Sequence, residues 1–102
     1  RTRNKGYADY GFGEGEEKKL KQWCKGPDFT EEFLLLESAK IANKDIFNDI
    51  YFSIVRGVSY ESMDRKVYQG IDKGSFYGYQ RKTLAIFRKG LIECGRYPFA
   101  TC

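Results

Sequence analysis

Apolar side chains recur along this chain at intervals of three and four residues, which is the spacing of an amphipathic helix. The spacing predicts five helices, over residues 14–25, 30–42, 44–56, 60–67 and 73–94. Gly26-Pro27 ends the first of them, and Gly57 follows the third at the position that glycine favours after a helix. Ser59 is suited to cap the fourth. We therefore expect an all-α fold, a small bundle of four to five helices.

The second and last helices are expected to supply most of the core. Helix 30–42 is too apolar for an exposed position and should lie at the centre, because it carries Phe33, Leu34, Leu35, Leu36, Ala39 and Ile41. Helix 73–94 begins after Asp72, its expected N-cap. One apolar stripe runs along it, formed by Phe76, Thr83, Leu84, Phe87, Leu91 and Cys94.

The length of 102 residues fits one domain. Residues 1–13 mix basic, glycine and aromatic residues, and we interpret them as an N-terminal arm or loop. Residues 14–102 then form a single helical domain, with a helix-turn-helix at about 58–94. The chain has no histidine and three widely spaced cysteines, so we expect a cytoplasmic protein with reduced thiols, no metal or other cofactor, and no enzymatic activity. No apolar run is long enough to predict a membrane span.

Charge is distributed unevenly along the chain, whose net charge is +4. Residues 30–72 carry five basic and eight acidic side chains, whereas residues 73–102 carry six basic and one acidic. The cationic excess therefore falls on the last helix and the residues after it. Such an excess indicates a surface for phosphate, although a solvated basic face without a partner has the same charge pattern.

The stretch from Ile54 to Arg88 resembles the helix-turn-helix of the promoter-reading C-terminal domain of the sigma-70 family, and of phage and transposon regulators built on that module. Gly57-Val58-Ser59-Tyr60-Glu61 is similar to the Gly-Leu-Ser-Tyr-Glu-Glu with which the family's motif begins. Gly70-Ile71-Asp72-Lys73-Gly74-Ser75 is similar to its Gly-Ile-Ser-Lys-Gly-Thr turn. The chain departs from the pattern at Asp64, at Tyr68-Gln69, an apparent insertion, and at Gln80, where the family has an apolar residue.

The resemblance implies a sequence-specific DNA-binding regulator of transcription that places helix 73–94 in the major groove of double-stranded DNA. Arg81 is the candidate for guanine, because its planar fork matches two acceptors of that base. Lys73 and Lys82 are expected to contact phosphates. Residues in the first turns of helix 73–94 that lie away from its apolar stripe should face the groove. The expected DNA-binding residues are Lys73, Ser75, Tyr77, Gly78, Arg81, Lys82, Arg88 and Lys89.

A second interpretation is a protein-interaction module that does not bind DNA. Aromatic residues make up 17% of the chain, and aromatic side chains are frequent anchors of protein interfaces. The expected anchors of such an interface are Tyr7, Tyr10, Phe12, Tyr97 and Phe99. The corresponding alternative for helix 73–94 makes Tyr77 and Tyr79 core aromatics and places Arg81 and Lys82 on a solvated face. The partner would be a second copy of the chain or RNA polymerase, which sigma-like modules bind.

Overall fold

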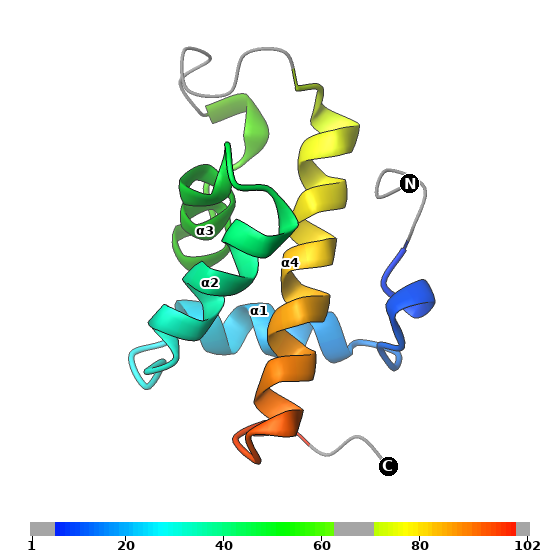
Figure 1. Cartoon of the computed structure of the whole chain (residues 1–102), viewed down its shortest axis with the longest axis vertical. Helices are drawn as coiled ribbons and strands as arrows, with labels where there is room; N and C mark the ends of the chain where they lie inside the picture. Colours follow the sequence, from blue (N-terminus) through cyan, green and yellow to red (C-terminus); the bar gives the residue numbers. More distant parts are fainter. Residues whose placement is uncertain (1–5, 63–70, 100–102) are drawn as a thin grey trace.

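The protein is all-helical throughout the residues that its computed structural model describes, 6–62 and 71–99 (Figure 1). Four α-helices and two short 3-10 turns follow one another along this part of the chain. They are η2 (Ala8–Tyr10), α1 (Glu16–Lys25), α2 (Glu32–Ala42), α3 (Phe47–Arg56), η3 (Tyr60–Ser62) and α4 (Lys73–Glu93). The predicted all-α fold is confirmed. Of the helix predicted over 60–67, the described part is a 3-10 turn, and residues 63–67 lie outside the described ranges.

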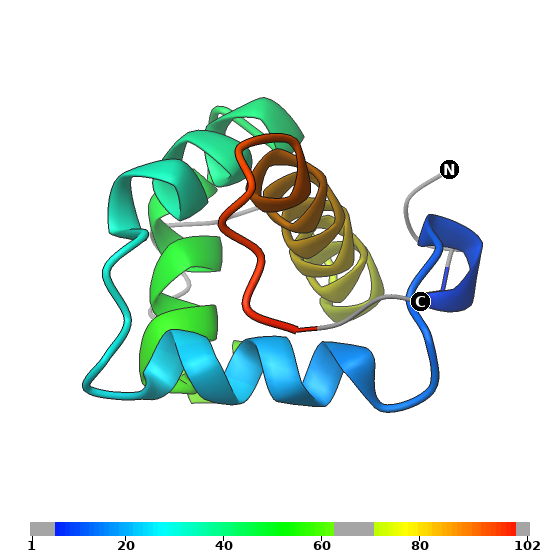
Figure 2. The same ribbon diagram turned by 90° about the horizontal axis from the view of Figure 1, so that it is seen from below.

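The longest helix, α4, forms the axis of the molecule (Figure 1). α2 packs along it in the opposite direction, with Leu34 beside Gly90 and the end of α2 beside the first half of α4. α3 completes this layer, and α1 lies across the lower half of α4 (Figure 2). The segment after α4 turns back over α1, so that residues from both ends of the chain meet beside the central helix.

The core draws on all four helices. Phe76, Leu84, Phe87 and Leu91 of α4 are completely buried, and they meet buried residues of the surrounding elements. These are Phe12, Leu20, Cys24, Leu35, Ala39, Ile46, Ile50 and Ile54. Burying a side chain of this size contributes about 1.5–3 kcal/mol to folding relative to an exposed position, so this cluster holds the helices together.

α2 packs against both α4 and α3, as expected of a helix predicted to lie in the core, but it buries only one of its faces. Phe33 is 77% exposed and Ile41 is 67% exposed, while Leu35 and Ala39 on the opposite side of α2 are fully buried. The physical reason is the unbroken apolar run at 33–36, which covers every side of the helix. A helix that packs through one face must leave part of such a run in solvent.

Two further expectations changed with the tertiary structure. Cys94 is exposed, because α4 ends at Glu93 and the buried part of the expected apolar stripe ends at Leu91. The described part of the expected N-terminal arm packs on the domain: Phe12 is 7% exposed, and its ring meets the edge of the Tyr7 ring at 5.1 Å. Within the described ranges, no helix combines the length and the low polarity that crossing a bilayer requires.

Candidate nucleic-acid interface

The residues before α4 are tied to its first turns through Tyr60. The backbone N–H of Tyr60 donates to the Tyr77 hydroxyl at 3.0 Å, and the Tyr60 hydroxyl donates to the carbonyl oxygen of Ile71 at 2.6 Å. Gly57 ends α3 with a φ of +68°, the left-handed conformation that glycine adopts without steric cost. The helix end predicted at Gly57 is therefore confirmed, and η3 is held beside the beginning of α4.

The opening turns of α4 are more enclosed than the sequence indicated. Gly78 is buried and offers no surface to a groove, and the half-buried Tyr77 hydroxyl already accepts the hydrogen bond from Tyr60. Lys73 is exposed but forms an ion pair with Glu61, which raises the pKa of its ammonium group. These contacts remove Gly78 and Tyr77 from the expected DNA-binding set and leave Lys73 partly neutralised.

Acidic side chains surround the same end of α4. Ser75 is half-buried and lines a hollow of about 350 Å³ together with Asp45 and Asp72. Carboxylates at this position repel phosphate, and Glu61 lies nearby on Lys73. The electrostatics therefore favour phosphate contact further along α4 rather than at its first turn.

Cationic side chains continue along the outer side of α4. Ser75, Lys82 and Lys89 recur every seven residues, which places them on one side of a helix of 3.6 residues per turn. This α4 stripe lies opposite the buried Leu84 and Leu91. Lys89 is exposed and Lys82 half-buried, and both line a shallow hollow of about 460 Å³ beside Tyr10, together with Arg88 and the acidic Glu93.

Arg81 lies next to the α4 stripe and faces the N-terminal segment. Burial raises the pKa of the Tyr7 and Tyr10 hydroxyls, and the nearby charge of Arg81 opposes that rise at both. The guanidinium is therefore close to two aromatic side chains at the edge of the cationic surface. Because Arg81 is half-buried, it could contact DNA only from the border of the α4 stripe that faces the N-terminal segment.

Arg88 lines the same hollow as Lys82 and Lys89, but its guanidinium is engaged by other side chains of the protein. Its Nε donates to Glu16 Oε2 at 2.6 Å, and its guanidinium lies 5.1 Å from the centre of the Phe12 ring and 5.7 Å from that of Tyr97. The Tyr97 hydroxyl donates to the same Glu16 oxygen. Nothing in the spacing of these residues signals the cluster, because it joins positions far apart in sequence.

Glu16 is the acceptor at the centre of this cluster. Burial raises the pKa of its carboxyl, but the hydrogen bonds from Arg88, Tyr97 and Gly13 outweigh that effect and leave the pKa below its ordinary value. Burial, and then the hydrogen bond to Glu16, raise the pKa of Tyr97 to about 12. The cluster therefore joins the start of α1, the second half of α4 and the C-terminal segment. At neutral pH its Glu16 carboxyl is ionised and its Tyr97 hydroxyl is protonated.

Of the eight expected DNA-binding residues, Lys82, Arg88 and Lys89 line one hollow, with the Arg88 guanidinium bound to Glu16. Ser75 shares the side of α4 that carries the two lysines but lines a separate hollow, and Arg81 lies at the border of this side. Asp64, Tyr68 and Gln69, which depart from the sigma-70 pattern, lie outside the described residues. Gln80 is buried and hydrogen-bonded to α3. No cluster of three or more potential metal ligands is found among the residues at 6–62 and 71–99.

The fold and this surface together define a small all-α protein with a cationic stripe on its central helix. Comparisons with protein-family models, curated proteins and solved structures found no match to the chain. The function is therefore inferred from the residues themselves.

Proposed function

We propose that this protein is a regulator that binds double-stranded DNA through the outer side of α4. The observation that carries the proposal is the α4 stripe, in which Ser75, Lys82 and Lys89 lie on the side of the helix that faces away from the core. The fifteen residues from Ser75 to Lys89 span about 21 Å of helix at about 1.5 Å per residue, enough to follow a DNA groove across several phosphates.

Each side chain has a role in this proposal. Lys82 and Lys89 bind phosphates, because an ammonium group on a flexible stem reaches a backbone oxygen without a fixed angle. Arg81, at the border of the stripe, is the group best suited to guanine, since its planar fork matches the two acceptors that guanine presents in the major groove. Ser75, which lies beside Asp45 and Asp72, contacts a base edge rather than a phosphate.

A fluorescence anisotropy titration against a labelled duplex of about 20 base pairs tests this proposal. Affinity should fall linearly with the logarithm of salt concentration between about 50 and 200 mM, because binding releases counterions from phosphates. The double variant Lys82→Ala/Lys89→Ala should bind roughly tenfold more weakly, with a salt slope that is shallower by about two. A selection from random duplexes would then find the preferred sequence.

The matched control is Lys25→Ala/Lys44→Ala, which removes the same charge from two exposed lysines outside α4. Its affinity and salt slope should stay close to those of the unmodified protein. The proposal fails if the unmodified protein does not bind duplex DNA at low salt. It also fails if the two double variants weaken binding equally, because the effect would then belong to net charge and not to α4.

A second candidate function is a homodimeric interaction module, and the exposed side chains of α2 favour it. Phe33 is 77% exposed and Ile41 is 67% exposed, two large apolar groups on one helix. Apolar surface that is exposed in a monomer is commonly covered at an interface. Light scattering over a hundredfold range of concentration should show a dimer that Phe33→Glu dissociates, and a monomer at every concentration would exclude this function.

A further inference from the structure

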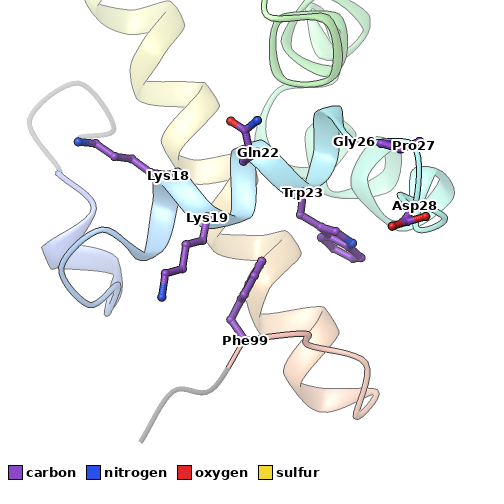
Figure 3. Close-up of a pocket in the computed structure, with 8 residues that line it drawn as sticks. All are labelled: Lys18, Lys19, Gln22, Trp23, Gly26, Pro27, Asp28 and Phe99. Atoms are coloured by element: carbon purple, nitrogen blue, oxygen red, sulfur yellow. The ribbon is translucent and has the colours of Figure 1, made fainter.

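A hollow beside α1 lies outside the DNA-binding proposal. Its volume is about 570 Å³, within the usual range for ligand sites. Residues of α1, the turn after it and the C-terminal segment line it: Lys18, Lys19, Gln22, Trp23, Gly26, Pro27, Asp28 and Phe99 (Figure 3). Figure 3 shows the rings of Trp23 and Phe99 on two sides of this space, with Lys18 and Lys19 further along α1.

The indole ring of Trp23 is fixed by its contacts with the core. One face stacks on Phe87, with ring centres 6.2 Å apart and the planes 18° from parallel. Phe29 and Phe99 meet the indole nearly at right angles, with ring centres 5.1 Å and 6.4 Å away. The apolar wall of the hollow is therefore preorganised, and a ligand that enters it loses little affinity to ordering of this side chain.

The polar groups of the hollow are mainly donors. Lys18 and Lys19 are exposed on its rim, and neither forms an ion pair with another side chain among the described residues. The indole N–H of Trp23 likewise has no hydrogen-bond partner within those residues. Asp28 is the one acidic side chain among the lining residues. The hollow therefore presents positive charge and a donor beside an apolar corner, which is complementary to a ligand with carboxylates and a bulky apolar group.

We propose that this hollow binds a short acidic segment of a partner protein. An aromatic or large aliphatic side chain of the segment enters the corner between Trp23 and Phe99, and its carboxylates meet Lys18 and Lys19. The corner geometry favours a peptide over single-stranded nucleic acid. A base stacks on a flat open ring, whereas one face of Trp23 is covered by Phe87 and the Phe99 ring stands at 88° to the indole.

Trp23 is the only tryptophan of the chain, so its fluorescence reports directly on this hollow. The probe is the blocked hexapeptide Asp-Glu-Phe-Leu-Glu-Asp, with two control peptides. The first replaces every acidic residue with lysine, and the second replaces Phe-Leu with Gly-Gly. The acidic apolar peptide should change the Trp23 emission in a saturable manner, and both controls should bind about tenfold more weakly or not at all.

Two variants locate the binding. Lys18→Glu/Lys19→Glu should weaken the hexapeptide about tenfold or more, and Phe99→Ala should weaken it to a similar extent because one wall of the corner is removed. Lys82→Glu/Lys89→Glu carries the same charge change on α4 and should bind the peptide as the unmodified protein does. Circular dichroism of each variant separates a loss of binding from a loss of folding.

The DNA-binding proposal and this one fail independently, since the two surfaces share no residue. The peptide assignment is overturned if the hexapeptide leaves the Trp23 emission unchanged at millimolar concentration, or if the lysine peptide binds equally well. It is also overturned if a thymidine hexanucleotide binds the hollow more tightly than the hexapeptide does, a result that would identify the occupant as single-stranded nucleic acid.

Discussion

The side-chain amide of Gln80 donates a hydrogen bond to Ser53 Oγ at 2.8 Å within the interface between α3 and α4. Both residues are 5% exposed, and Ser53 Oγ in turn donates to the carbonyl oxygen of Val58 at 2.8 Å. The two bonds connect the middle of α4 to the turn after α3. A polar side chain at a position where an apolar one was expected is therefore paired, which removes most of the cost of burying it.

Replacing Ser53 with Ala should lower the free energy of unfolding by about 1–3 kcal/mol, because the buried amide of Gln80 loses its acceptor. Urea denaturation followed by circular dichroism measures the change. Ser59→Ala is the control, since among the described residues the Ser59 hydroxyl is hydrogen-bonded to the exposed Ser62 and should contribute little. Adding Gln80→Leu to Ser53→Ala should recover part of the loss, and a Ser53→Ala protein as stable as the unmodified one would contradict the pairing.

Arg88 should be required for stability more than for ligand binding. Its side chain is 17% exposed and that of Glu16 is 11% exposed, so removing the guanidinium leaves a carboxylate with little water around it. Arg88→Leu should cost about 3 kcal/mol. Lys89→Leu, one residue further along α4 and exposed, should change stability by no more than about 0.5 kcal/mol. Equal losses in the two variants would mean that the buried pair contributes nothing.

Lowering the pH should destabilise the fold by protonating Glu16, the residue that accepts hydrogen bonds from Arg88 and Tyr97. The folded state lowers the pKa of this carboxyl, so the deprotonated form stabilises the fold above the ordinary value near 4.5. That stability is lost as the pH falls below this value through the folded pKa. Unfolding midpoints of the unmodified protein and of Glu16→Gln, measured between about pH 3 and 7, should converge toward the acid end. A difference that stays constant with pH would exclude titration of Glu16.

Gly90 in the interior of α4 should accept a side chain with a gain in stability. A Cβ atom built there lies 3.5 Å from Leu34 Cδ1, an ordinary van der Waals distance. Gly90→Ala should therefore stabilise the protein by up to about 1 kcal/mol through helix propensity. Gly57→Ala is the opposite case, because the φ of +68° strains any residue with a Cβ. Thermal unfolding should rank Gly90→Ala above the unmodified protein and Gly57→Ala below it.

Asp49 in the first turn of α3 should be a destabilising residue at neutral pH. Its Oδ2 atom is buried without a hydrogen-bond partner in the described structure, and burial raises the pKa of the carboxyl. A raised pKa means that the fold favours the protonated form, so the ionised carboxyl costs stability above its ordinary value. Asp49→Asn should raise the free energy of unfolding at pH 7 by about 1 kcal/mol, with no gain in acid.

Local chemistry explains which parts of the fold were predictable. The turn at Gly57, the start of α4 after Asp72 and the stop after Lys25 depend on residues within a few positions of each other, and all three lie where the sequence indicated. The burial of Leu84 and Leu91 was also predicted, because a stripe at helical spacing needs one partner surface whatever that surface is.

The candidate site was less predictable, because exposure depends on what packs against a helix. Arg88 and Lys89 are adjacent and carry the same charge. Arg88 is partly buried because it bonds to Glu16, which is distant in sequence and also accepts from Tyr97, whereas Lys89 is exposed. Phe99 was a candidate interface anchor from the sequence, but its place beside Trp23 was not predictable, since the two residues are more than seventy positions apart.

By itself, the sequence determined the helical class and most helix boundaries, because hydrophobic periodicity, capping and glycine turns act over a few residues. Only the tertiary structure decided which face of α2 is buried, so that Phe33 remains exposed, and that Phe12 of the N-terminal segment is buried. Both outcomes arise because the chain has more apolar side chains than its small core can bury. Which of these side chains are buried is decided by the packing of the helices against one another.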